Sequence, residues 1–285
     1  MMPHIAGTTR LYALVGDPLE TARSPELLNR LFTDQGEDAA CIPFWVKEAS
    51  LPAFAAGARA MGNLSGMLVT MPHKQTMMAF VDELHPTALQ VGALNVIRCN
   101  DDGRWVGAIF DGIGCVLGMQ WEGNDPKNKS VLLVGAGGAG RAIAFAVASA
   151  GARSLTISDV DALRADELAR SVEQATGCST QAGPPDPRGF EIIINATPMG
   201  MHPDDAMPVD PERLAPDSVV VDIINSPEPT RLCRTAQARG CRTQNGRPMH
   251  EGQAVHALRF LGFDYRPEGR TLLDGALPPA SGSYP

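Results

Sequence analysis

The 285-residue sequence has few cysteines, and none of them stands in a pattern that signals a metal site or a disulfide framework. Its six cysteines form no Cys-x-x-Cys pair, and no histidines lie at ligand spacing beside them. Zinc sites and disulfide-rich folds need such spacings. We therefore expect no bound metal and expect buried or incidental thiols in a reducing compartment.

Long apolar runs and concentrated positive charge are also missing. No stretch approaches the roughly 18 apolar residues that a membrane span needs, and the N-terminus has no basic segment followed by an apolar core. The formal net charge is −8, without a cluster of Lys and Arg, which disfavours nucleic acid and anionic membranes as partners. We expect a cytoplasmic monomer or homodimer that binds a small-molecule substrate.

The order of apolar segments predicts an α/β fold with two domains. Residues 1–115 alternate strands and helices, and the strand in "GMLVTMPHKQT" (66–76) is followed by a proline, a histidine and a lysine. Ser24 followed by Pro25 predicts a helix start with serine at the cap. We expect an N-terminal α/β substrate domain with at least partly parallel strands.

A polar stretch without periodicity (121–129) separates this region from a second unit. Residues 120–245 contain an apolar strand, a glycine-rich turn, an alanine-rich helix and further apolar strands, which predicts a Rossmann-type dinucleotide-binding domain. A helix at 246–265 is expected to pack back on the first domain. The tail at 267–285 has no means of burying a core and is expected to be mobile.

The glycine-rich turn "GAGGAG" supplies Gly135, Gly137 and Gly140 in the G-x-G-x-x-G spacing, directly after a strand and at the start of a helix. The first glycine permits a tight turn, the second lets the backbone approach a pyrophosphate, and the third lets the helix pack closely on the sheet. The helix N-terminus then attracts the phosphate charge. This context predicts a bound dinucleotide.

The next strand ends at Asp159, 19 residues beyond Gly140, where the ribose-binding acid of such folds is found. A carboxylate there accepts hydrogen bonds from the ribose hydroxyls and repels a 2′-phosphate. NAD is therefore expected to be preferred over NADP. Arg164 lies close enough in sequence to weaken that charge argument.

A nicotinamide cofactor needs a partner that moves a proton while the hydride moves. The sequence offers Lys74, after a strand, and Asp111 in "GAIFDGIG". A carboxylate can orient a lysine, and partial burial lowers a lysine pKa toward its working range. A solvated loop lysine is the alternative interpretation of Lys74.

At this point the chain resembles the shikimate/quinate dehydrogenase family, and the resemblance runs nearly end to end. The motifs "GDPLETARSP", "LVTMPHK", "GALN", "GAIFD", "GAGGAG", "NATPMGM" and "GRPMHEGQA" match the family's elements in order and spacing. The resemblance implies an NAD(P)-dependent oxidoreductase that transfers hydride reversibly between nicotinamide and a cyclic hydroxy acid.

The resemblance also implies residue roles. Lys74 matches the catalytic lysine and Asp111 its partner. Ser24, Thr70, Asn95 and Gln253 match positions that hydrogen-bond the substrate, although a helix cap explains Ser24 equally well. The dinucleotide positions are expected to be Gly135, Gly137, Gly138, Ala139, Gly140, Asp159, Thr197 and Met199.

Several substrate positions depart from the family pattern. Ala22 replaces a serine, Leu68 an asparagine, Val96 a frequent threonine, Ile109 and Phe110 an Asn-Thr pair, and Asn225 a tyrosine. We therefore expect a substrate other than shikimate. Arg23, next to the missing serine, is a candidate carboxylate ligand, although a solvated loop arginine is the favoured interpretation. Two alternatives stay open: an authentic shikimate or quinate dehydrogenase, and a non-catalytic protein that senses a dinucleotide or another ligand.

Overall fold

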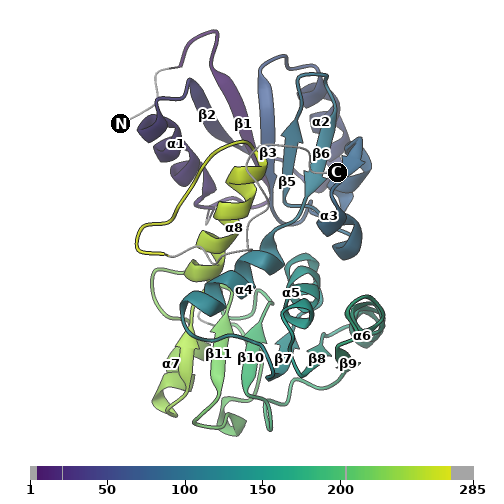
Figure 1. Ribbon diagram of the computed structural model, residues 1–285, viewed down its shortest axis with the longest axis vertical. Coiled ribbons are helices and arrows are strands. Elements are labelled where there is room, and N and C mark those ends of the chain that lie inside the picture. Colours follow the sequence, from purple (N-terminus) through teal and green to yellow (C-terminus); the bar gives the residue numbers. More distant parts are fainter. Residues whose placement is uncertain (1–4, 21, 203, 271–285) are drawn as a thin grey trace. The chain divides into compact units, whose positions relative to one another are not determined.

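The computed structural model describes residues 5–20, 22–202 and 204–270. The chain divides into two compact units, each with its own sheet (Figure 1). The first unit holds the described residues up to Phe110 together with residues 257–265, and the second holds residues 111–256 and 266–270.

These bounds differ from the expected ones. The first segment ends at Phe110, not near residue 115, because Asp111 begins a helix that continues without a break to Trp121. The C-terminal helix ends at Phe260, and only its end, from Ala257, belongs to the first unit. Of the expected tail, residues 267–270 belong to the second unit, and 271–285 lie outside the described residues.

The first unit contains six strands and the helices between them. The strands are β1 (Arg10–Gly16), β2 (Ala39–Trp45), β3 (Leu64–Val69), β4 (Glu83–Leu84), β5 (Val96–Cys99) and β6 (Trp105–Ala108). The helices are α1 (Ser24–Gln35), α2 (Leu51–Arg59) and α3 (Pro86–Val91), with the short 3-10 helices η1 (Glu48–Ser50) and η2 (Thr76–Phe80).

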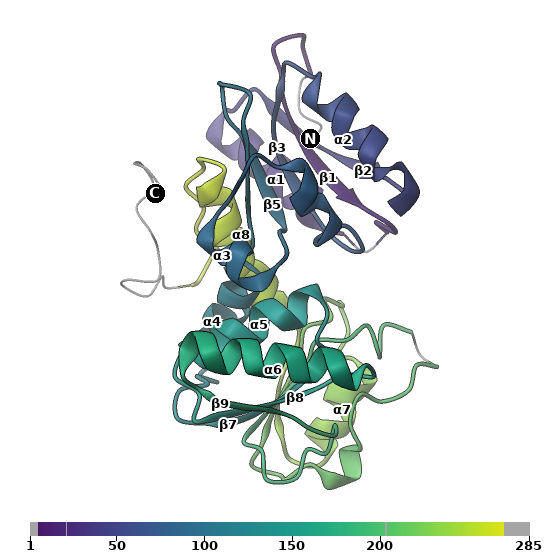
Figure 2. The ribbon, with the colours of Figure 1, turned by 90° about the vertical axis from the view of Figure 1, so that its right-hand side faces the viewer.

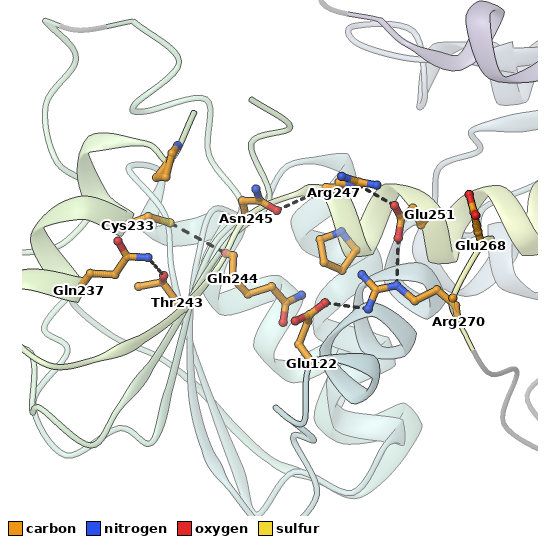
Figure 3. Close-up of a pocket in the computed structure, with 13 residues that line it drawn as sticks. Glu122, Cys233, Gln237, Thr243, Gln244, Asn245, Arg247, Glu251, Glu268 and Arg270 are labelled. Atoms are coloured by element: carbon orange, nitrogen blue, oxygen red, sulfur yellow. Dashed lines mark hydrogen bonds and ion pairs between the residues drawn. The ribbon is translucent and has the colours of Figure 1, made fainter. Parts of the chain in front are cut away.

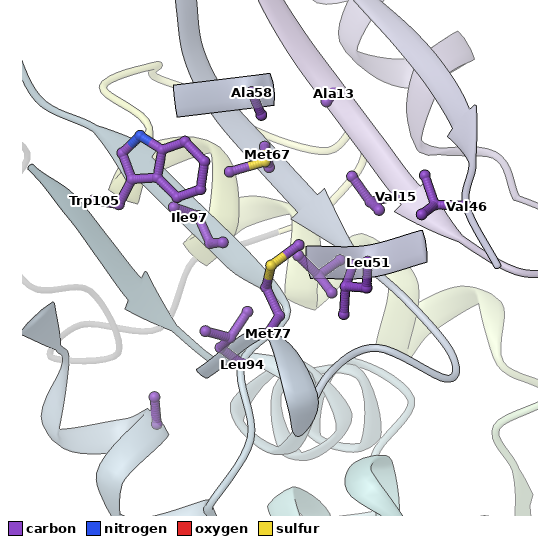
Figure 4. Packing of buried hydrophobic residues seen from close by; sticks show 12 residues of the cluster. Ala13, Val15, Val46, Leu51, Ala58, Met67, Met77, Leu94, Ile97 and Trp105 are labelled. Atoms are coloured by element: carbon purple, nitrogen blue, oxygen red, sulfur yellow. The ribbon is translucent and has the colours of Figure 1, made fainter. Parts of the chain in front are cut away.

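The strand order of this sheet is β2-β1-β3-β5-β6-β4. Strands β1, β2 and β3 are parallel, whereas β5 is antiparallel to both β3 and β6. One face packs on α2, η2 and α3 through a cluster that includes Leu51, Met67, Met77 and Leu94 (Figure 4). On the other face Tyr12 lies 5.1 Å, between ring centroids, from Phe32 of α1.

The second unit carries six more strands. They are β7 (Ser130–Val134), β8 (Ser154–Ser158), β9 (Ser179–Ala182), β10 (Ile192–Asn195), β11 (Val219–Asp222) and β12 (Arg242–Gln244). The helices are α4 (Asp111–Trp121), α5 (Gly138–Ser149), α6 (Ala162–Thr176), α7 (Arg231–Ala238) and α8 (Arg247–Phe260), with the 3-10 helix η3 (Pro211–Arg213).

All neighbouring strands of this sheet are parallel, in the order β12-β11-β10-β7-β8-β9. This is the doubly wound order of a dinucleotide-binding domain, in which β7 and β10 lie at the point where the winding reverses. Figure 2 shows α6 beside β8 and β9. Every residue of β7 is buried, as expected of a strand covered on both faces. No helix in the described ranges is long and apolar enough to cross a membrane.

Candidate active site

The glycine-rich turn joins β7 to α5 at the carboxyl edge of the second sheet. Gly135 has a φ of +108°, and a Cβ there would lie 2.8 Å from the Ala196 carbonyl oxygen. A Cβ on Gly140 would lie 2.0 Å from the Gly135 oxygen, so the helix packs against its own turn. A Cβ on Gly137 would meet nothing within 4 Å. The turn is therefore closed on the sheet side and open above Gly137.

This geometry fits a dinucleotide. Gly137 is the N-cap of α5 and has no side chain to satisfy the first helical amides, and Gly138 and Ala139 form the helix's first turn. Free amides and the helix dipole favour a phosphate at that point, and the space over Gly137 leaves room for its close approach.

Asp159, which follows β8, holds this turn in place. Its Oδ2 accepts a hydrogen bond from the amide of Ala136 at 2.6 Å, and its Oδ1 accepts one from Asp161 at 2.9 Å. The Arg164 guanidinium lies 3.8 Å from Oδ1. Each carboxylate oxygen accepts more than one hydrogen bond, so these contacts leave acceptor capacity for ribose hydroxyls.

Thr197 and Met199 lie in the loop after β10, and a buried polar network shapes that loop. Asn195 Oδ1 accepts hydrogen bonds from the amide and hydroxyl of Thr197, and the Thr197 Oγ1 accepts one from the Met199 amide. Asn195 Nδ2 donates to Asp222 Oδ1 at 3.1 Å. Thr230 donates to the other Asp222 oxygen at 2.6 Å.

Sequence reasoning missed this network. The sequence signal was a polar residue at the end of each of two apolar strands, and the register of β10 and β11 pairs these residues, Asn195 and Asp222. Burial raises the pKa of Asp222, while hydrogen bonds from Thr230, Ile224 and Asn195 oppose that shift. The loop that this network shapes begins beside the glycine turn, because the Ala196 amide donates to the Val134 carbonyl at 2.7 Å.

In the first unit the structure gathers Thr70, Lys74 and Asn95 at one edge of the sheet. Thr70 follows β3 directly, and its amide donates to Val15 of β1 at 2.9 Å. The Lys74 carbonyl accepts a hydrogen bond from Leu94, and the Asn95 carbonyl accepts one from Val69, both at 2.8 Å. Asn95 is buried, and its Oδ1 accepts the amide hydrogen of Phe110 at 3.2 Å.

Ser24 is the first residue of α1 and not its cap. The N-cap is Arg23, which makes no side-chain capping bond, so the predicted cap at Ser24 is wrong by one position. Proline follows within the first turn, as expected. Arg23 is exposed and pairs with Glu26 at 3.1 Å, the arrangement of a solvated surface arginine.

His73, the residue before Lys74, has a structural role. Its ring is fully buried, and Nε2 lies 2.6 Å from the Val46 carbonyl oxygen. This contact ties the loop after β3 to the chain after β2. It fixes the backbone from which Lys74 projects, a role that the sequence did not reveal.

Asp111 and Gln253 belong to the second unit, so the structure divides the predicted substrate and catalytic residues between the two units. Asp111 is buried at the start of α4. Gly114, one turn later, lies against α8: a Cβ there would be 2.4 Å from the Gln253 amide nitrogen. Close packing of α4 on α8 thus brings Gln253 beside the first turn of the helix that Asp111 begins.

The positions that depart from the family pattern are mostly buried. Leu68, Ile109 and Phe110 are 7%, 2% and 2% exposed. The Phe110 ring packs 5.7 Å from Phe260 and 6.1 Å from His85, between centroids. These side chains offer no polar partner at the sheet edge. Asn225, by contrast, is exposed after β11.

A separate pocket of about 460 Å³ lies at the β12 edge of the second unit (Figure 3). It is lined by α7, by the ends of α4 and β12, by the start of α8, and by Glu268 to Arg270. The glycine turn follows β7, three strands away in the sheet, so this pocket is distinct from the dinucleotide position.

Comparison with known proteins identifies the family. Residues 14–97 match the family described as the shikimate dehydrogenase substrate binding domain. A shikimate dehydrogenase (NADP(+)) of Desulforamulus reducens is 36% identical over 270 residues, which cover 91% of this chain and 92% of the relative. The structure of a shikimate dehydrogenase in complex with NADP+ has a TM-score of 0.85 at 32% identity and covers 92% of each chain.

Two further structures are similar over most of their length. The quinate dehydrogenase of Corynebacterium glutamicum, in complex with NAD, is 31% identical with a TM-score of 0.78, covering 89% of this chain and 93% of that one. The ligand-free 5-ketofructose reductase of a Gluconobacter strain is 30% identical with a TM-score of 0.79, covering 95% and 97%.

The chain therefore belongs to the shikimate/quinate dehydrogenase family, and the predicted fold class, a substrate domain joined to a Rossmann-type domain, is confirmed. It is an NAD(P)-dependent oxidoreductase that acts on a CH–OH group.

Proposed function

We propose that this protein transfers hydride reversibly between a nicotinamide dinucleotide and a cyclic hydroxy acid that carries fewer hydroxyl groups than shikimate. The observation that carries the proposal is the combination of retained and lost polar residues in the first unit. Thr70, Lys74 and Asn95 lie at one sheet edge, while Leu68, Ile109 and Phe110 present alkyl and aromatic groups where the family has hydrogen-bonding side chains.

The proposed substrate residues divide by role. Ser24, Thr70, Asn95 and Gln253 hydrogen-bond the substrate's polar groups. A substrate hydroxyl that faces an alkyl side chain loses its hydration without a replacement, at a cost of about 1–3 kcal/mol. Two or three such losses reduce specificity for shikimate by roughly 10²-fold to 10⁴-fold.

The proposed chemistry rests on Lys74 and Asp111. When bound, nicotinamide supplies or accepts the hydride. In the oxidation direction Lys74 accepts the proton of the substrate hydroxyl while the hydride leaves the carbon that bears this hydroxyl. Asp111 is the carboxylate that orients Lys74. The resemblance to the family supports both roles, and the tie from His73 to Val46 supports a fixed backbone at Lys74.

We further propose NAD as the preferred cofactor. Asp159 places a carboxylate beside the glycine turn, which favours ribose hydroxyls and disfavours a 2′-phosphate. The relatives include proteins named for NADP(+) and a structure with NAD, so the family accommodates both. Arg164, 3.8 Å from Asp159, is the residue here that would attract a 2′-phosphate.

The similarity to the 5-ketofructose reductase supports the proposal of a substrate other than shikimate. A protein of this fold and similar length is named for a different carbonyl compound. The alternatives are an authentic shikimate or quinate dehydrogenase and a dinucleotide-binding protein without turnover. Retention of the Lys74 and Asp111 pair argues against the last, since a protein that only binds has no use for a proton-transfer pair.

One assay separates the three functions. The purified protein is incubated with NAD or NADP and a panel of cyclic and acyclic hydroxy acids, and NADH or NADPH absorbance is followed. Turnover of a panel member well above that of shikimate and quinate supports the proposal. Comparable turnover of shikimate or quinate indicates the first alternative. Dinucleotide binding without turnover of any panel member indicates the second.

A further inference from the structure

Arg270 connects the two helices that carry Asp111 and Gln253. Its Nη1 lies 2.9 Å from Glu122 Oε1, directly after α4, and its Nε donates to Glu251 Oε2 of α8 at 3.2 Å. The guanidinium also lies 5.3 Å from the centroid of the Trp121 ring. Figure 3 shows Arg270 between the two carboxylates.

The Arg270 and Glu251 side chains are partly buried, at 23% and 18% exposed, whereas the Glu122 side chain is 40% exposed. A turn that includes Gly269, with a φ of +71°, presents Arg270, whose amide donates to Pro267 at 3.3 Å. Glycine is the residue suited to that backbone conformation. A hydrogen-bonded turn therefore holds the backbone at Arg270.

The helices it joins touch through glycine. A Cβ on Gly118 would lie 2.5 Å from the Pro248 carbonyl carbon, and a Cβ on Gly252 would lie 2.6 Å from the Gly114 oxygen. Backbones in such close contact offer few interlocking side chains that oppose sliding of one helix along the other. An ion pair at the far end of α4 supplies that restraint.

We propose that Arg270 is a positioning residue, which fixes α4 on α8 and thereby sets the distance between Asp111 and Gln253. An α-helix is rigid over its length, and the 11 residues of α4 span about 16 Å, so a restraint at Trp121 acts on Asp111. The inference rests on the roles of Asp111 and Gln253 proposed above.

The chain offers a matched control. Arg247 donates to the other oxygen of Glu251, Oε1, at 2.8 Å, but this pair stays within α8. Arg247→Ala therefore removes one guanidinium from the same carboxylate without touching α4. Arg270→Ala removes the link between the helices. Arg270→Lys keeps the positive charge but replaces the rigid planar guanidinium with a compact ammonium on a flexible stem, which holds two carboxylates in place less firmly.

The test measures kcat, substrate KM and dinucleotide Kd for all three variants, with whichever substrate the wild type turns over. We expect Arg270→Ala to lower kcat/KM roughly 10-fold or more, with a raised KM, since small misplacements of catalytic groups are costly. In Arg270→Ala the dinucleotide Kd and the binding stoichiometry should stay within twofold of the wild-type values. Arg270→Lys should recover part of the loss, and Arg247→Ala should resemble the wild type.

Hydrogen exchange gives a readout that needs no substrate. Amides near the start of α4 should exchange faster in Arg270→Ala and not in Arg247→Ala. Unchanged exchange and kcat/KM in Arg270→Ala would overturn the proposal. A second outcome would also overturn the proposal: dinucleotide stoichiometry falls by the same factor as kcat, while KM is unchanged. That outcome indicates general unfolding. If the wild type turns over no hydroxy acid, the proposed function fails while the exchange result still decides the role of Arg270.

Discussion

Asp159 accepts the amide hydrogen of Ala136 at 2.6 Å, so the acid after β8 also holds the turn after β7. Removing this side chain would therefore change two properties at once, the discrimination between ribose and phosphate and the shape of the phosphate-binding turn. Asp159→Asn separates them, because an amide oxygen still accepts a hydrogen bond but carries no charge.

We expect wild-type protein to bind NAD more tightly than NADP, and Asp159→Asn to narrow that gap about 10-fold. Asp159→Ala should narrow it too, while weakening both affinities through loss of the Ala136 contact. Arg164→Ala, in which only NADP should weaken, is the control. Fluorescence titration with both dinucleotides measures these constants. A wild type that prefers NADP would refute the assignment of Asp159.

The glycines at 137 and 140 should respond differently to the same substitution. A methyl group at Gly140 would meet the Gly135 oxygen at 2.0 Å, so Gly140→Ala should destabilise the second unit by about 3 kcal/mol. A methyl group at Gly137 meets nothing within 4 Å, so Gly137→Ala should fold normally but bind dinucleotide at least 10-fold more weakly. Urea unfolding and dinucleotide titration distinguish the two. If Gly137→Ala and Gly140→Ala changed the free energy of unfolding and the dinucleotide affinity equally, the proposed phosphate position would be contradicted.

Lys74→Ala should lower turnover roughly 10²-fold or more while leaving dinucleotide binding intact, because the lysine acts on the substrate proton. Lys74→Arg should also be slow, since an arginine does not give up its proton in the working range. Lys127→Ala, at an exposed site in the second unit, provides the control. Steady-state kinetics at saturating dinucleotide decide the matter. Full activity of the alanine variant would remove Lys74 from the chemistry.

Stability should fall in acid through Glu191. Hydrogen bonds from Lys129 and Ser130, with further help from Arg153, lower the pKa of Glu191 to about 2 from an ordinary value of 4.5. A carboxyl group whose pKa is lower in the folded than in the unfolded protein stabilises the fold at pH values above its unfolded-state pKa. This stabilisation is lost as the pH falls toward the folded-state pKa.

Glu191→Gln should therefore be less stable than wild type at pH 7, and the difference should shrink between about pH 4.5 and pH 2. Urea unfolding at several pH values measures it. The side chain is 38% exposed, so solvent screening keeps the effect modest. A difference that is constant across this range would show that Glu191 acts through packing instead.

The sequence predicted the parts of the fold that follow from short-range pattern. The apolar run of β7, the glycines after it and the acid after β8 identify a dinucleotide-binding unit because each has a local physical cause. The network of Asn195, Asp222 and Thr230 was missed although Asn195 and Asp222 each end an apolar strand, since their contact depends on the register between β10 and β11.

The first unit shows the same limit. Its short β4 and the helix α3 carry weak periodicity and were not anticipated. The helix start near Ser24 was recognised but misplaced by one residue, because the dipeptide Ser-Pro suits either a cap or a first turn. The structural role of His73 depends on Val46, 27 residues away, and had no sequence signal.

The most direct test of the proposed function is the specificity constant of the wild type for shikimate and quinate, measured with NAD and with NADP. Because Leu68, Ile109 and Phe110 cannot pair with substrate hydroxyls, we predict kcat/KM values at least roughly 10²-fold below the value for the best substrate found in the panel. A kcat/KM near about 10⁵ M⁻¹s⁻¹ for shikimate or quinate, ordinary for a physiological substrate, would contradict the proposal.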